Sequence, residues 1–130
     1  MKLLTITNQD PRFYPLLGPF LASRDVVSYL GGHMWDDDGK AWTVAIGASG
    51  VGGFIGAIRG RGGVIKAQSC YAVPGHEAVI PALIRAVIDA SSPSPLTAVV
   101  RGDHAGPWLA EGFTSVQDKG RFAHLVRKGD

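Results

Sequence analysis

Three β-prone runs follow one another in the middle of the chain with very little sequence between them. They cover residues 41–46, 53–58 and 64–73. The connecting stretches contain GASG and RGRGG, and short connections rich in glycine are typical of β-hairpins. Eight of the 18 glycines lie between residues 47 and 63, so the glycine excess belongs to this region. We therefore predict three sequential antiparallel strands at the centre of the fold.

A long apolar helix is predicted directly after the third run. Pro74 and Gly75 end the run, and residues 78–91 are then mostly Ala, Val, Ile or Leu. The polar positions are four residues apart and therefore share one helix face: Glu77, Pro81, Arg85 and Asp89. Because proline is tolerated only in the first turn, we expect the helix to begin near Val79 and to be buried on most of its circumference.

The remaining elements complete the order of an α+β protein. A strand over residues 3–7 precedes a region with apolar residues at helical spacing, where Pro15 and Pro19 predict only short or broken helical turns. The other expected elements are a helix over 25–30, a strand over 96–101, a helix over 105–111 and hairpin strands over 114–117 and 122–126. We predict one domain over residues 1–130, with a mixed, mostly antiparallel central sheet flanked by helices.

Charge, cysteine content and hydropathy limit the context. The formal net charge is +2 and the basic residues are scattered, so binding to nucleic acid is not expected. The single cysteine, Cys70, excludes an internal disulfide, and the acidic loop DDDG lacks the alternating ligands of a calcium site, so no metal site is predicted. No apolar run approaches the ~18 residues of a membrane span. A cytoplasmic protein without membrane contact is therefore expected.

Three segments carry a resemblance to a known family. They are AWTVAIGASGVGGFIGAIRGRGGVIKAQSCYAVP, PALIRAVIDAS and HAGPWLAEGF, and their most telling parts are Tyr71-Ala72-Val73-Pro74 and Gly112-Phe113. In this order and at this spacing they resemble the GCN5-related N-acetyltransferases (GNAT). The resemblance covers nearly the whole chain and lies in the order of elements more than in one motif. It implies a GNAT-like fold and transfer of an acetyl group from acetyl-CoA to an amine.

The resemblance also implies where acetyl-CoA would bind. In the family, the strand before the main helix offers backbone groups to the pantetheine arm, and backbone N–H groups at the helix start hold the pyrophosphate. In this chain those segments are residues 71–73 and 75–80. The predicted cofactor-binding residues are therefore Tyr71, Ala72, Val73, Gly75, His76 and Ala78.

The phosphate-binding loop departs from the family's Arg-x-x-Gly-x-Gly/Ala pattern. Gly75 stands where the pattern has arginine, and the two small positions are Ala78 and Ile80. The branched Ile80 would lie where the backbone approaches phosphate, Pro81 removes an N–H donor, and Glu77 places a negative charge beside the anion. The sequence therefore predicts a degenerate loop with a weakened hold on acetyl-CoA.

A second departure concerns the general acid. Many members of the family place a tyrosine four residues before the glycine of the Gly-Phe pair, and this position is Trp108 here. An indole N–H is a poor proton donor to a thiolate. His104, with Asp103 beside it, is the candidate catalytic pair, and the alternative is an ordinary polar loop after a buried strand. Cys70 is interpreted as a small buried strand residue rather than as a nucleophile.

Two functions from different classes follow. The first is an acetyl-CoA-dependent N-acetyltransferase acting on an unknown amine. The second is a non-catalytic GNAT-fold module, a pseudoenzyme, that binds a protein partner and has lost the cofactor. A nucleic-acid adaptor using the basic RGRGG turn is a less favoured third function, and a homodimer is a further expectation. A cleft open between residues 71–73 and 97–101 would support the enzyme, and one filled by Trp108 or Ile80 would oppose it.

Overall fold

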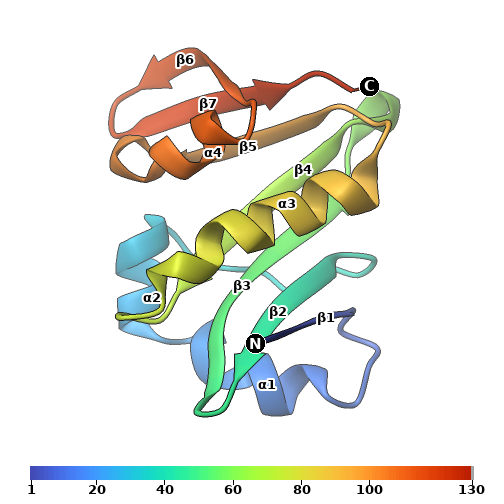
Figure 1. Cartoon of the computed structure of the whole chain (residues 1–130), viewed down its shortest axis with the longest axis vertical. Helices are drawn as coiled ribbons and strands as arrows, with labels where there is room; N and C mark the ends of the chain where they lie inside the picture. Colours follow the sequence, from blue (N-terminus) through green and yellow to red (C-terminus); the bar gives the residue numbers. More distant parts are fainter. Residues whose placement is uncertain (130) are drawn as a thin grey trace.

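The computed structural model describes residues 1–129, in which one mixed sheet has helices on both faces (Figure 1). The strand order is β1-β2-β3-β4-β5-β7-β6, and of these neighbours only β4 and β5 are parallel. The strands are β1 (Lys2–Ile6), β2 (Ala41–Gly47), β3 (Gly50–Arg59), β4 (Ile65–Ala72), β5 (Leu96–Arg101), β6 (Thr114–Lys119) and β7 (Phe122–Arg127). The helices are α1 (Phe13–Leu21), α2 (Arg24–Leu30), α3 (Ile80–Ser91) and α4 (Gly106–Ala110), with short 3₁₀ turns η1 (Arg61–Gly63), η2 (Glu77–Val79) and η3 (Gly102–His104). The predicted α+β class and the mixed, mostly antiparallel sheet flanked by helices are confirmed.

The predicted centre of the fold is also confirmed. Strands β2, β3 and β4 pair antiparallel in sequence order, and β6 and β7 form the closing hairpin. Helix α3 begins at Ile80, one residue after the predicted start at Val79. Pro81 lies in its first turn, where a missing N–H costs no helical hydrogen bond. Residue 130 of the predicted domain lies outside the described residues.

The N-terminal helix α1 is more regular than its two prolines predict. Residues 13–21 form one short helix of nine residues, so of the predicted short or broken helical turns the short form is present, and the helix is continuous. Pro15 lies in the first turn, and Pro19 is two residues from the end, so one hydrogen bond is lost near the helix end. Phe13 and Leu17 are fully buried one turn apart, and their packing under the sheet outweighs that loss.

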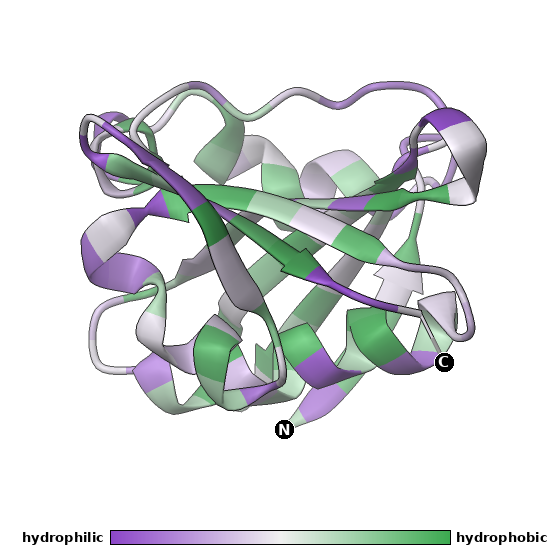
Figure 2. Ribbon diagram, turned by 90° about the horizontal axis from the view of Figure 1, so that it is seen from above, coloured by the Kyte–Doolittle hydropathy of each residue, from purple (hydrophilic) through white to green (hydrophobic). Residues whose placement is uncertain are grey.

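Two hydrophobic cores lie on opposite faces of the sheet. On one face, α3 crosses the sheet and buries Leu83, Ile84 and Val87. On the other face, α1 and α2 cover an aromatic core that contains Trp42 and Phe54. Seen from above, the sheet is strongly twisted and its strands carry long hydrophobic stretches between the helices (Figure 2). This arrangement fixes the strand ends on which the candidate site is built.

Gly53 on β3 lies against the backbone of the neighbouring strand. A Cβ there would be 2.6 Å from the carbonyl oxygen of Tyr71 and 2.8 Å from Cγ2 of Val79. We expect Gly53→Ala to lower the free energy of unfolding by about 1–3 kcal/mol, because a strand backbone cannot move aside cheaply. In Gly47→Ala, the control, the new Cβ meets no atom within 4 Å, so the change is expected to stay below about 0.5 kcal/mol. Urea unfolding of both variants is the measurement, and equal midpoints would contradict the expectation.

Strands β4 and β5 pair over only part of their length. Their register joins Ile65–Ala67 to Leu96–Ala98 and goes no further within the described residues. Beyond this point β4 contains a bulge: the β3 register shifts between Phe54 and Gly56, and Ser69 has a left-handed φ of 56°. A bulge bends its strand and increases the local twist. The bend turns β4 away from β5 and leaves a space between them.

Candidate functional site

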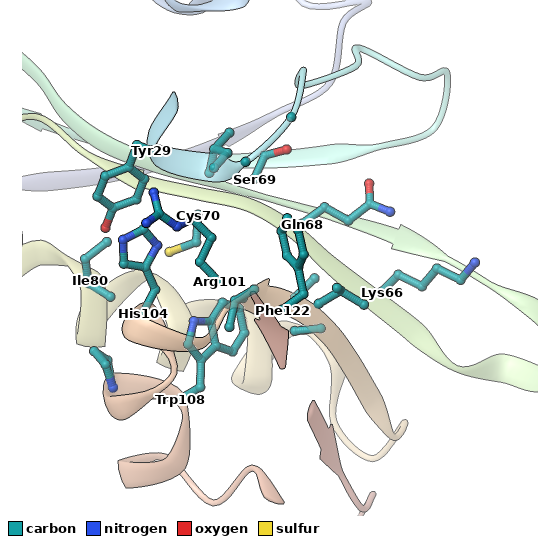
Figure 3. A pocket seen from close by; sticks show the side chains of 18 of the residues that line it. Tyr29, Lys66, Gln68, Ser69, Cys70, Ile80, Arg101, His104, Trp108 and Phe122 are labelled. Atoms are coloured by element: carbon teal, nitrogen blue, oxygen red, sulfur yellow. The ribbon is translucent and has the colours of Figure 1, made fainter. Parts of the chain in front are cut away.

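A cavity of about 650 Å³ lies between the diverging ends of β4 and β5 (Figure 3). Strand β4 contributes Gln68, Ser69 and Cys70 to its wall, and β5 contributes its last residues up to Arg101. Trp108 and Ile80 line the cavity without filling it. The opening predicted between these two strands is therefore present. On β4 it is lined by residues 66–70 and not by the predicted residues 71–73.

His104 lies at the end of β5, in η3, with its ring facing the cavity. The ring stacks on Tyr29 of α2, with 4.1 Å between ring centroids and 21° between planes. Burial lowers the pKa of His104, Asp103 opposes this shift, and Arg101 adds to it. The imidazole is therefore more strongly held in its neutral form than a free histidine. A neutral imidazole is a proton acceptor, which is the form that general-base chemistry needs.

Asp103 also lines the cavity, but its carboxylate is bound to Arg101 rather than to His104. Oδ2 of Asp103 accepts a hydrogen bond from Nη2 of Arg101 at 3.2 Å, whereas Oδ1 is 3.9 Å from Nε2 of His104. The second distance is too long for a hydrogen bond. Arg101 also donates from Nη1 to the carbonyl of Ser28 at 3.1 Å, which ties β5 to α2. The predicted pair is brought together, with Arg101 as an additional member that sequence reasoning missed.

Two further cavity residues, Trp108 and Cys70, are in environments that do not favour reactivity. Trp108 is buried and packs edge-to-face against Phe113 with 5.1 Å between ring centroids. Burial raises the pKa of the Cys70 thiol to about 12, so the thiol stays protonated at neutral pH. A protonated thiol is a poor nucleophile. The interpretation of Cys70 as a structural strand residue agrees with this environment.

The loop before α3 contains a carboxylate, that of Glu77, which is bound by the backbone of the same loop. The backbone N–H of Gly75, which has a left-handed φ of 90°, donates to Oε1 of Glu77 at 3.0 Å. That hydrogen bond is the main cause of a lowered pKa of Glu77, so the carboxylate is charged at neutral pH. Glu77 and Ile80 line the cavity. The segment predicted to bind pyrophosphate therefore offers one of its backbone donors to its own carboxylate.

The other predicted cofactor residues lie beside the cavity rather than in its lining. Tyr71 and Ala72 are buried and pair with Phe54 and Gly53 of β3. The N–H of Val73 donates to the Gly52 carbonyl at 2.8 Å. The two residues nearest the helix start are exposed: His76 and Ala78. Within residues 1–129, none of these is in the cavity lining, and their part in cofactor binding stays a prediction.

Lys40 is a second cavity residue that was not identified as such from the sequence. Its side chain is only 1% exposed, and the residue lines the cavity from the start of β2. A sequence signal exists, because Lys40, Trp42 and Val44 alternate onto one face of a strand and the last two are apolar. A lysine whose side chain points to the same strand face as two apolar residues is a candidate for a buried charge.

No helix of residues 1–129 is long and apolar enough to cross a membrane. In the same residues no three His, Cys, Asp or Glu side chains are grouped as a metal ion would require. The cavity is thus the place where the polar and titratable groups discussed above converge.

No protein-family model and no curated protein sequence matches the chain. Solved structures do match it along its length. ElaA from Escherichia coli superimposes with a TM-score of 0.78 at 8% identity, over 98% of this chain and 100% of that one. An acyl-CoA N-acyltransferase from Pseudomonas aeruginosa gives 0.69 at 9% identity, over 98% and 99%. An acetyltransferase of the GNAT family from Staphylococcus aureus Mu50 gives 0.64 at 12% identity, over 97% and 98%.

These matches concern fold, since the identities are far below those at which function transfers. They cover nearly all of each chain, so the likeness includes the whole sheet and the helices on both of its faces. The resemblance of the sequence segments and the superposition of the structures agree. The chain therefore has the GNAT fold, in a divergent form.

Proposed function

We propose that this protein transfers an acyl group from a coenzyme A thioester to an amine. The observation that supports this most is the cavity between β4 and β5, with a neutral-favouring His104 at the end of β5. Strand β4 has no strand partner on its β5 side after Ala67 in the described residues. An unpaired strand edge offers its N–H and C=O groups to an amide-rich arm.

The described residues fit the thioester arm of the cofactor. The cavity is of ligand size, and its two strand walls combine small or apolar residues with polar ones such as Gln68, Ser69 and Thr97. Residues 68–70 would flank the arm on β4, and residues 99–101 would flank it on β5. When bound, the thioester supplies an acyl carbonyl that is activated toward amines. The fit to the pyrophosphate is weaker, because Glu77 already accepts the N–H of Gly75.

His104 has the proton-handling role in this proposal. An amine reacts as a nucleophile only after it has lost a proton from its ammonium form. His104 accepts that proton at a ring nitrogen, and burial helps because it keeps the ring neutral beforehand. The stack on Tyr29 fixes the plane of the ring. Arg101 and Asp103 form an ion pair beside the His104 ring. Asp103 therefore contributes its negative charge to the site without a hydrogen bond to the imidazole.

The second candidate is a non-catalytic module that binds a protein partner. The carboxylate of Glu77 in the phosphate loop favours it, because an internal anion opposes binding of a diphosphate. Trp108 favours it as well, since its buried indole lines the cavity without an acidic proton to give to a thiolate. Under this alternative the cavity would bind no thioester.

Calorimetric titration with acetyl-CoA separates the two candidates. The expected result is saturable binding with a dissociation constant in the micromolar range, followed by release of free thiol when a mixed panel of primary amines is added. Acetyl-pantetheine is expected to bind too, because the arm provides the contacts. Absence of heat and of any thermal shift at millimolar acetyl-CoA would contradict the enzyme and leave the protein-binding module.

A further inference from the structure

Lys40 is a charged residue placed inside the wall of the cavity. It precedes β2, its side chain is 1% exposed, and its Nζ donates to the carbonyl of Trp35 at 3.1 Å. The same Nζ lies 4.6 Å from the centre of the Trp42 ring. Both Lys40 and Trp35 line the cavity, and Trp35 is 65% exposed. The ammonium group is therefore buried where the cavity meets the loop between α2 and β2.

The fold makes room for this lysine at one glycine. A Cβ at Gly56 of β3 would lie 2.6 Å from Cε of Lys40 and 3.3 Å from the Trp42 ring. The side chain of Lys40 thus passes over β3 at the only residue type that has no side chain. Gly56 pairs with Gln68 of β4, which also lines the cavity. The burial of Lys40 therefore depends on residues of both β2 and β3.

The ammonium group of Lys40 forms no close ion pair in the described residues. No carboxylate there lies within 4.0 Å of its Nζ. Asp37 and Asp36 act on it from a greater distance, and Asp36 also accepts a hydrogen bond from the Tyr14 hydroxyl at 2.6 Å.

Burial lowers the pKa of Lys40, and the charges of Asp37 and Asp36 oppose that shift. A buried ammonium carries three donors and is costly unless it is paired. In residues 1–129 the side chain of Lys40 has one hydrogen-bond acceptor, the carbonyl of Trp35. Besides this bond, the ammonium group has the Trp42 ring at 4.6 Å and the more distant charges of Asp37 and Asp36. It therefore has donors left that an anion entering the cavity can accept.

We infer that the amine acceptor of this protein carries a carboxylate, which pairs with Lys40 while its amino group faces His104. The inference rests on the proposed function, because it names the acceptor of that reaction. Lys40 and His104 line the same cavity from different elements, one at the start of β2 and the other after β5. A free amino acid, or a similar small amino carboxylate, has both groups in one molecule. Lys40 is then a specificity-determining residue, while His104 handles the proton.

The test compares L-amino acids with their α-carboxamides, which differ in the anionic group. Acetyl transfer is followed by thiol release, and kcat/KM for acid and amide is measured in wild type and in Lys40→Met. We expect Lys40→Met to lower the ratio of kcat/KM for the acid to kcat/KM for the amide at least about tenfold, because the charge-assisted pair between Lys40 and the carboxylate is lost. Gly56→Ala is expected to do the same by displacing Lys40. Lys66→Met, which removes an exposed cavity-lining lysine, is expected to keep the wild-type ratio.

A structural role of Lys40 gives a different result. If Lys40 only anchors the loop through Trp35, Lys40→Met lowers the rates with acid and amide by the same factor, and an unchanged ratio overturns the inference. Thermal shifts with the amino acids alone, without acetyl-CoA, test the carboxylate site independently of acyl transfer. Stabilisation of wild type by the acids, weaker with the amides and lost in Lys40→Met, supports the carboxylate site even where no transfer occurs. No preference for the acids in either assay overturns it.

Discussion

Replacing His104 by alanine is expected to lower kcat/KM for acyl transfer by about 10²- to 10⁴-fold, the usual contribution of a positioned general base. The reason is that the neighbouring titratable groups in residues 1–129 are poor bases at neutral pH: Cys70 and Tyr29 keep their protons, and Asp103 is bound to Arg101. The affinity for acetyl-CoA should change little, because His104 is expected to act on the amine. Initial rates of thiol release and calorimetry measure the two quantities separately.

The pH profile identifies His104 as the group responsible. Only the neutral imidazole accepts a proton, so kcat/KM should rise with pH through the pKa of His104. Burial lowers that pKa, so this acid limb is expected below the ordinary value of histidine. In His104→Ala the limb should disappear, and added imidazole should restore part of the rate. A limb that remains unchanged in the variant would show that another group titrates.

Removing the charge of Glu77 is expected to tighten binding of acetyl-CoA by about tenfold at low ionic strength, and by less in salt. Glu77→Gln keeps a side-chain oxygen that accepts the N–H of Gly75, so the loop geometry is preserved while the negative charge is lost. The pyrophosphate would then meet a helix start without an opposing carboxylate.

The matched control for Glu77→Gln is Asp89→Asn. Asp89 is exposed near the other end of α3, so its substitution by Asn removes one negative charge from the same helix at a distance from the loop. Its affinity for acetyl-CoA is expected to equal that of wild type. Acetyl-pantetheine, which lacks the pyrophosphate, should bind all three proteins equally. If Glu77→Gln binds acetyl-CoA no better than wild type, the carboxylate does not limit the loop.

The strands and the main helix were predictable because their signals are local. The glycine-rich connections of β2, β3 and β4 and the polar spacing of α3 depend only on neighbouring residues. The continuity of the short helix α1 was not, because the burial of Phe13 and Leu17 comes from packing against the sheet and outweighs the effect of the prolines. Tertiary packing of this kind leaves no mark in a short window of sequence.

The site was only partly predictable for a similar reason. His104, Asp103 and Trp108 follow a strand end, so their place could be read from element order. The bulge at Ser69 could not be foreseen, since it puts a residue other than glycine at a positive φ. The burial of Lys40 depends on the space at Gly56, sixteen residues away on another strand. The charge of Glu77 at the loop depends on its hydrogen bond with the N–H of Gly75. Such contacts exist only after folding.

A crystal structure of the protein with bound acetyl-CoA would show whether the cavity between β4 and β5 is the thioester site. We expect the thioester arm between these strands, along residues 68–70 and 99–101, with the acyl group toward His104. Saturating acetyl-CoA that leaves this cavity empty, or that binds on another surface of the sheet, would contradict it.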